Sequence, residues 1–211
     1  MEITWLGHSC FKMKGKEATL ITDPYGESVG YPMSNPGANI VTLSHRHPGH
    51  SNADGIGDSP RVVSGPGEYE IAGVFIIGMA TFHDSQQGKE RGKNIIYLIE
   101  MDDIRMCHLG DIGHVLSPQQ VGELGAVEIL LVPVGGVSTI NSKVAAEVVR
   151  LINPKIILPM HYRTEVINWL DPVDDFLTEM GQKQAMLQKK LVVTRSNLPP
   201  ESKVTLLDYR S

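Results

Sequence analysis

The chain has 211 residues, a formal net charge of −5 and only two cysteines. This length is enough for one domain with a real hydrophobic core, and we expect residues 1–211 to form a single domain. The acidic balance disfavours a nucleic-acid partner, no apolar run is long enough to span a bilayer, and Cys10 and Cys107 are too few for a disulfide framework. We therefore expect a cytoplasmic protein and leave open whether it forms a homo-oligomer.

Short strand patterns dominate the first half of the chain. β-Branched and apolar runs predict strands over residues 3–6, 10–13, 18–21, 39–43 and 61–64, followed by hairpins over 68–82 and 94–108. A loop rich in Gly, Pro, Ser and Asn runs from Gly26 to Asn39, and a loop of this length is often the wall of an active site. The polar stretch from Asp84 to Gly92 is typical of a solvated loop.

Strands and helices alternate in the second half. Helices are predicted to start at Ser117-Pro118, at Asn141 and at Asp171-Pro172, where capping residues precede helical spacing. Further strands are predicted over 127–134, 155–160, 191–194 and 203–207. This order indicates sheets that are covered by helices.

The histidines gather where predicted strands end. Three of the eight stand in the segment Ser44-His45-Arg46-His47-Pro48-Gly49-His50, directly after a buried strand pattern. The others that follow strand patterns are His8, His83, His108 and His161, and Asp111 stands close to His108. Neutral imidazole is the commonest metal ligand, so a spaced triple favours a metal site over a polar loop that contains histidines by chance.

The order and spacing of these residues resemble the metallo-β-lactamase superfamily. The matching positions are Asp23, His45, His47, His50, His83, Asp111 and His161, and they extend over nearly the whole chain. Shorter motifs resemble a bacterial subgroup that includes ascorbate-6-phosphate lactonase: Trp5-Leu6-Gly7-His8-Ser9, His108-Leu109-Gly110-Asp111 and Pro159-Met160-His161-Tyr162. The resemblance implies an α+β fold, an αββα sandwich of two packed, mainly antiparallel sheets with helices on the outer faces.

The resemblance also implies a ligand set for one or two divalent metal ions, usually Zn²⁺ and in some relatives Mn²⁺ or Fe²⁺. His45, His47 and His83 would hold the first ion, and Asp111 would bridge to the second. His50 and His161 would help to hold the second ion, and Asp23 would orient the loop that carries the ligands.

Gly49 departs from the superfamily pattern. The pattern has an Asp at this position, which binds the second metal and accepts a hydrogen bond from the attacking water. Glycine supplies neither function, so we expect a weak second site of two imidazoles and a shared carboxylate. One metal ion would still activate a water molecule.

The predicted function is hydrolysis of an ester-like bond, a lactone or a phosphodiester, in a small molecule, for which a negative charge is one option. A metal-activated water would attack, with Asp111, His8 or His108 as the proton acceptor. For His8 and His108 a purely structural role is an equal alternative. Arg163 could hold an anionic group or could face solvent.

Two other function classes stay open. Gly49 is the argument for a protein that keeps the scaffold as a binding or regulatory module without catalysis. A nuclease of the same superfamily is less favoured, because only about fifty residues separate Asp111 from His161 and leave no room for a large inserted domain.

Overall fold

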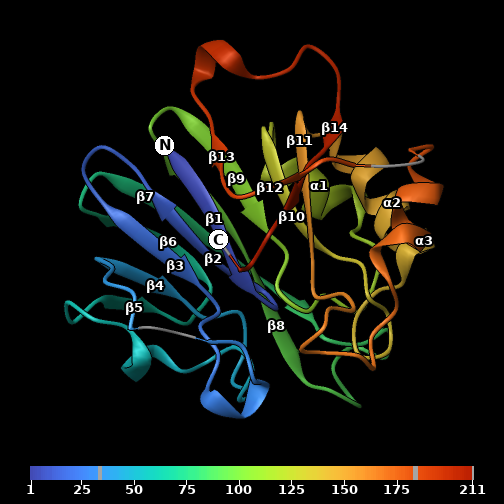
Figure 1. Cartoon of the computed structure of the whole chain (residues 1–211), viewed down its shortest axis with the longest axis horizontal. Coiled ribbons are helices and arrows are strands. Elements are labelled where there is room, and N and C mark those ends of the chain that lie inside the picture. Colours follow the sequence, from blue (N-terminus) through green and yellow to red (C-terminus); the bar gives the residue numbers. More distant parts are fainter. Residues whose placement is uncertain (33–34, 183–184, 211) are drawn as a thin grey trace.

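The computed structural model describes residues 1–32, 35–182 and 185–210. Two β-sheets pack face to face, and the N-terminal part of the chain forms the first of them (Figure 1). The strand order of this sheet is β13-β1-β2-β3-β4-β5. Its strands are β1 (Glu2–Gly7), β2 (Cys10–Lys14), β3 (Thr19–Thr22), β4 (Ile40–Thr42), β5 (Arg61–Val63) and β13 (Leu191–Val192).

The second sheet has the strand order β14-β11-β10-β9-β8-β7-β6. Its strands are β6 (Gly67–Ile71), β7 (Val74–Phe82), β8 (Lys93–Met101), β9 (Ile104–His108), β10 (Ile129–Pro133), β11 (Ile156–Met160) and β14 (Lys203–Val204). A short parallel pair, β12 (Leu187–Gln188) with β15 (Leu206–Leu207), stands apart from both sheets. The sequence analysis did not predict β12.

The predicted fold class is confirmed, but the sheets are mixed rather than mainly antiparallel. Strands β13, β1, β2 and β3 pair antiparallel, whereas β3, β4 and β5 pair parallel. In the second sheet β6 to β9 pair antiparallel, and β9, β10, β11 and β14 pair parallel. Parallel neighbours need long crossover connections, and the helix between β10 and β11 is one of these.

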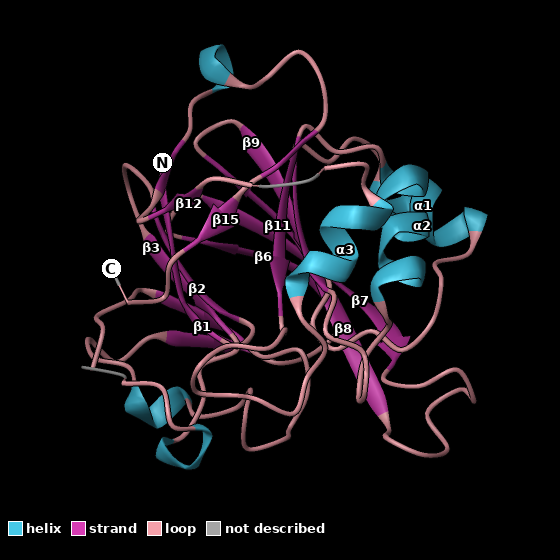
Figure 2. Ribbon diagram, turned by 45° about the vertical axis from the view of Figure 1, so that its right-hand side comes forward, coloured by secondary structure: helices cyan, strands magenta, loops and turns pink. Residues whose placement is uncertain are grey.

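The helices lie together outside the seven-stranded sheet (Figure 2). They are α1 (Pro118–Leu124), α2 (Ser142–Ile152) and α3 (Val173–Glu179). Two predicted caps are present: the side chain of Ser117 accepts from the backbone N–H of Gln120, and that of Asn141 accepts from the N–H of Val144. Helix α3 follows Pro172 as predicted, but without a side-chain cap. None of the described helices is long and apolar enough to cross a membrane.

The outer face of the first sheet is covered by loops rather than by α-helices. Ile21 and Val41 point outward from β3 and β4 into a second apolar cluster. Loop residues close over them, and these are Tyr25, Tyr31, Ile56, Ile167 and Leu170. Near this cover the described residues form only two short 3-10 helices, η1 (Glu27–Val29) and η2 (Ala53–Gly55). The prediction of helices on both outer faces is therefore correct for one face only, because aromatic and branched loop side chains exclude water from the other.

Candidate metal centre

Six of the eight histidines meet around the carboxylate of Asp111, although their positions in the sequence span more than 150 residues. They follow the ends of β1, β4, β7 and β11, and Asp111 follows the end of β9. They are His8, His45, His47, His50, His83 and His161. The Oδ2 atom of Asp111 lies 3.2 Å from Nε2 of His50, 3.3 Å from Nε2 of His83 and of His161, and 3.9 Å from Nε2 of His45. One carboxylate oxygen thus faces four imidazoles.

These histidines form two groups of three, which we call the first and the second triad. The first triad is His45, His47 and His83, and the second is His8, His50 and His161. Within each triad, one ligand nitrogen of every residue lies within 4.8 Å of the other two. Each triad is compact enough to surround one metal ion, with Asp111 between them.

Asp23 supports residues of both triads through hydrogen bonds. Its fully buried carboxylate accepts hydrogen bonds from the backbone N–H of Ser44 at 2.7 Å, from the Ser44 hydroxyl, and from Nδ1 of His50 at 3.0 Å. The Ser44 hydroxyl also lies 2.9 Å from Nδ1 of His45. Burial alone would raise the pKa of Asp23, but the hydrogen bond from His50 and neighbouring histidine charges lower it. The geometry is that of a carboxylate that fixes ligand orientation.

The electrostatics of the cluster favour a positive ion at its centre. Burial and the neighbouring His50 lower the pKa of His45 to about 3, which keeps its imidazole neutral. Burial would also lower the pKa of His50, but the carboxylates of Asp111 and Asp23 raise it to about 10. Burial disfavours the charged form of Asp111, yet the surrounding histidines hold its pKa well below the ordinary range. In the metal-free protein a proton on His50 therefore neutralises part of the buried negative charge.

Several buried ring nitrogens of the cluster lack a hydrogen-bond partner in the described part of the chain, and other nitrogens face its centre. Among the described residues, four buried imidazole nitrogens of the cluster have no hydrogen-bond partner: Nδ1 of His8, Nε2 of His45, Nδ1 of His83 and Nδ1 of His161. Such a concentration of unpaired buried polar atoms is costly without a ligand. In His45 and His50 the Nδ1 atom is held by Ser44 or Asp23, which leaves Nε2 for coordination. Imidazole nitrogens with a carboxylate oxygen are a donor set that suits Zn²⁺ and its neighbours in the first transition row.

Gly110 lets the loop that carries Asp111 approach the loop that carries His45. Its φ of +56° lies in the left-handed region, and a Cβ atom there would come within 2.5 Å of the Ser44 Cβ atom and 2.4 Å of the Asn94 Oδ1 atom. The same Asn94 oxygen accepts from the backbone N–H of Asp111 at 3.0 Å. Glycine at this position therefore permits the close contact that places the carboxylate.

Two residues for which the sequence suggested a role in catalysis or substrate binding, His108 and Arg163, do not line the cavity beside the cluster. His108 is fully buried; its Nε2 lies 2.9 Å from the carbonyl oxygen of Ser9, and its Nδ1 accepts from the N–H of Gly110 at 3.3 Å. Both ring nitrogens thus have hydrogen-bond partners, which favours the structural alternative for His108. Arg163 does not line the cavity beside the cluster; its Nε donates to the carbonyl oxygen of Leu170 at 2.7 Å. It ties together the loop before α3.

Arg91 is the cation that the sequence analysis missed. The cluster opens into a cavity of about 450 Å³ that Arg91 lines together with His47, His83 and Asp111. The segment expected to be a plain solvated loop is organised around the carboxylate of Asp84, which accepts four backbone N–H groups, those of Gln86, Gly88, Glu90 and Arg91. Burial would raise the pKa of Asp84, but these four donors lower it to about 2. The sequence signal is an Asp followed by a Gly-containing polar loop, which is typical of side-chain capping of backbone groups.

The fold and the histidine cluster together define a metallo-β-lactamase-type protein, and the comparisons with known proteins agree. A family profile described as the beta-lactamase superfamily domain matches residues 2–161. A UPF0173 protein of Pyrococcus abyssi is 30% identical over 78% of this chain and 84% of its own length. A UPF0173 metal-dependent hydrolase of Pyrococcus horikoshii is 27% identical over 87% of this chain and 93% of its own length.

Among solved structures, a protein of the metallo-β-lactamase superfamily from Thermotoga maritima is 41% identical. It superimposes with a TM-score of 0.83 over 98% of this chain and 97% of its own chain. This chain belongs to the metallo-β-lactamase superfamily and, within it, to the UPF0173 family of metal-dependent hydrolases.

Proposed function

We propose that this protein is a metal-dependent hydrolase that cleaves an ester-like bond, a lactone or a phosphodiester, in a small anionic molecule. The observation that carries the proposal is the Oδ2 atom of Asp111, which faces four imidazole Nε2 atoms at 3.2–3.9 Å in a buried cluster. The names of relatives as metal-dependent hydrolases support the same class of reaction. The choice of an ester-like bond rests on the short sequence motifs that resemble those of ascorbate-6-phosphate lactonase.

The first triad and Asp111 would hold one ion, with Zn²⁺ as the first choice and Mn²⁺ or Fe²⁺ as alternatives. A bound divalent ion lowers the pKa of a coordinated water to about 7 and polarises a carbonyl or phosphoryl oxygen. Asp23 and Ser44 keep His45 in the tautomer that presents Nε2 to the cluster. Asp111 stays ionised, because the surrounding histidines hold its pKa well below the ordinary range, and it supplies the negative charge of the ligand set.

The cavity beside the cluster matches a small substrate with one charged end. Its volume of about 450 Å³ is within the range of small-molecule sites. The guanidinium of Arg91 stands in the rim, where its Nη2 atom donates to the carbonyl oxygen of Val137 at 3.2 Å. Apolar side chains line another part of the wall, and these are Val29, Val166, Ile167 and Trp169. We propose that Arg91 binds the anionic group, while these side chains exclude water from the rest of the substrate.

The test measures metal content and hydrolysis together. Purified protein is loaded with Zn²⁺ or Mn²⁺, freed of excess ion and analysed for metal per chain, then assayed on a panel of lactones, phosphodiesters and simple carboxylic esters. We expect at least one ion per chain and metal-dependent hydrolysis in the panel. The His45→Ala variant should lose both metal from the first triad and activity, because Nε2 of His45 has no other partner among the described residues.

The same measurements decide against the alternatives. A chain that binds no metal after loading, or a His45→Ala variant with full activity, rejects the proposal. Metal uptake without hydrolysis of any panel member favours the binding or regulatory scaffold. The two buried free thiols, Cys10 and Cys107, agree with a reducing compartment, and we place the reaction in the cytoplasm as part of the proposal.

A further inference from the structure

We propose that His8 is a direct ligand of a second metal ion, which it holds together with His50, His161 and the shared carboxylate of Asp111. The inference rests on the proposed metal centre and adds a ligand to it that comes from the loop between β1 and β2. The sequence predicted a weak second site with two imidazoles, whereas this inference gives that site three imidazoles.

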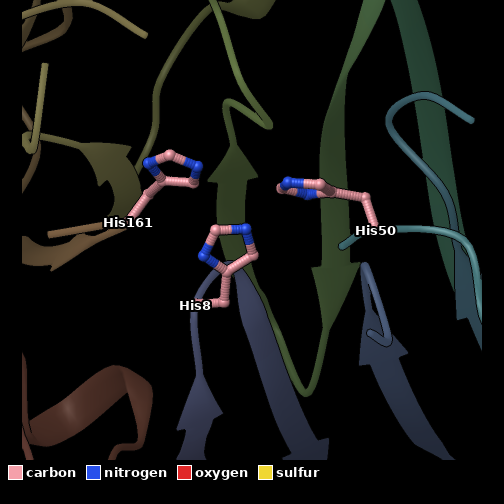
Figure 3. Close-up of side chains that lie close together, drawn as sticks. All are labelled: His8, His50 and His161. Atoms are coloured by element: carbon pink, nitrogen blue, oxygen red, sulfur yellow. The ribbon is translucent and has the colours of Figure 1, made fainter. Parts of the chain in front are cut away.

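The three rings converge on one point from separate parts of the fold. Figure 3 shows His8, His50 and His161, each of which turns a ring nitrogen toward the space between them. The ring centroid of His8 lies 4.7 Å from that of His50 and 4.2 Å from that of His161. The exposed fractions of the three residues are 6%, 2% and 2%. Three buried imidazoles at this spacing, with a carboxylate oxygen 3.2–3.3 Å from two of them, would supply four donors of the kind that hold a Zn²⁺ ion.

Gly49 makes room for the ring of His8. A Cβ atom built on Gly49 would lie 3.1 Å from Nε2 and 3.3 Å from Cδ2 of His8, closer than ordinary van der Waals contact. A side chain at position 49 and the imidazole of His8 would therefore compete for the same space beside His50. Because position 49 is glycine, the space beside this position is left to the imidazole of His8. His8 thus adds an imidazole to the second triad next to position 49, where glycine supplies no ligand.

The backbone of His8 is fixed in an uncommon conformation that aims the ring inward. Its φ is +53°, and that of His161 is +52°, in a region that residues other than glycine rarely adopt. The carbonyl oxygen of His8 accepts from Nε1 of Trp5 at 3.0 Å and from the backbone N–H of His161 at 3.1 Å. These bonds lock the two histidines to each other. Such maintained outliers occur where a side chain must be held for a function.

His8 also differs from the structural histidine of this chain. Both ring nitrogens of His108 have hydrogen-bond partners. By contrast, the buried Nδ1 of His8 has none among the described residues, and the ring faces the cavity beside His50 and His161. A ring that is packed, held by its backbone and turned toward two other buried imidazoles fits a metal ligand better than a packing residue.

The decisive variant is His8→Phe, which keeps an aromatic ring at the site and removes both nitrogens. Zn²⁺ titration by calorimetry and metal analysis should give two ions per chain for the wild type and one for His8→Phe. The affinity for the second ion should fall by more than about a hundred-fold, beyond what loss of an outer-shell partner costs. The His114→Phe variant is the matched control, because His114 belongs to neither triad; its ring contacts the carbonyl oxygen of Val115 and accepts from the backbone N–H of Phe82, and the variant should still bind two ions. Circular dichroism checks folding, and His8→Asn repeats the titration if the Phe variant does not fold.

A second variant tests whether a carboxylate at position 49 can replace the imidazole of His8. In His8→Ala the space beside position 49 is open, so adding Gly49→Asp places a carboxylate there without the contact to the ring. We expect the double variant to regain two Zn²⁺ ions per chain, and X-ray absorption should show fewer imidazoles per metal than in the wild type.

The outcomes separate this inference from the proposed function. The inference about His8 is overturned if His8→Phe binds two ions with unchanged affinity. It is also overturned if the wild type and His8→Phe each bind a single ion. In either case the first triad and the hydrolase proposal stand. No ion in any variant rejects the metal centre and this inference with it. Two ions in the wild type, one in His8→Phe and two in the double variant establish His8 as the ligand.

Discussion

The two triads around Asp111 have the same donors but are built in different ways. In the first triad, His45 and His47 stand two residues apart after β4, and His47 is exposed to the cavity. In the second triad the residues come from positions 8, 50 and 161, and all three are buried. A group built largely from one short loop tolerates movement elsewhere in the fold. The second triad exists only when the β1–β2 loop, the β4 loop and the end of β11 are in register, so it should respond more strongly to any perturbation.

Asp111→Ala should have the largest effect, because this carboxylate belongs to both triads. Four imidazole nitrogens lie within 3.9 Å of its Oδ2 atom, so its loss leaves like-charged or unpaired rings with no common partner. We expect both metal affinities to fall by more than about a hundred-fold and hydrolysis to reach background. Metal titration and the hydrolysis panel measure this.

The control for this variant is Asp103→Asn in the exposed β8–β9 turn, where φ is +63° and asparagine is well tolerated. If Asp111→Ala lost metal from one triad only, the carboxylate would not be shared, and the two triads would be independent metal sites.

Asp23→Asn should weaken both triads unequally. Asp23 bonds directly to Nδ1 of His50, but it reaches His45 only through Ser44. The buried carboxylate loses its charge, so we expect unfolding to become easier by about 3 kcal/mol and metal affinity to fall about ten- to a hundred-fold, more in the second triad. Chemical denaturation and stepwise Zn²⁺ titration test this. Equal losses in both triads would contradict the unequal support seen in the structure.

The metal-free protein should lose stability at alkaline pH through the second triad. Asp111 and Asp23 raise the pKa of His50 to about 10 in the fold. The stability that the protonated ring contributes is complete below its ordinary pKa of about 6.5 and is lost as pH rises through about 10. Thermal melts from pH 7 to 10.5 should show a fall in the melting temperature of the wild type that the His50→Gln variant lacks. The difference between the two proteins separates the titration of His50 from that of lysines and tyrosines.

Loading with metal should remove this dependence on pH, because the ion takes the place of the proton on His50 and proton release accompanies binding. Identical pH profiles for wild type and His50→Gln would show that the ring carries no proton in the metal-free state.

Arg91→Ala should have the smallest effect and leave both triads intact. Arg91 lines the cavity but contacts Val137 rather than the imidazoles. We expect two bound ions, an unchanged kcat and a KM for anionic substrates raised about ten- to a hundred-fold, the value of one hydrogen bond to a charged group. The exposed Lys89 of the same loop provides the control, Lys89→Ala. A fall in kcat or in metal content would mean that Arg91 supports the triads themselves.

The sequence by itself determined which residues could meet. Apolar periodicity predicted most strands and all three helices, and capping residues such as Ser117 and Asn141 predicted helix starts correctly. These signals are local, because a strand or a cap depends on neighbours within a few residues. The position of His45, His47 and Asp111 after strand patterns likewise indicated a common site, and the structure brings them together where strands of both sheets end.

Only the tertiary structure decided how the second triad is completed and what surrounds it. His8 joins His50 because Gly49 leaves space and because a left-handed backbone at His8 turns the ring inward. Arg91 rather than Arg163 reaches the cavity, because the Asp84 carboxylate folds its loop back. Each outcome depends on contacts between segments far apart in the chain. Packing and backbone strain set those distances, and residue type and spacing alone do not encode them.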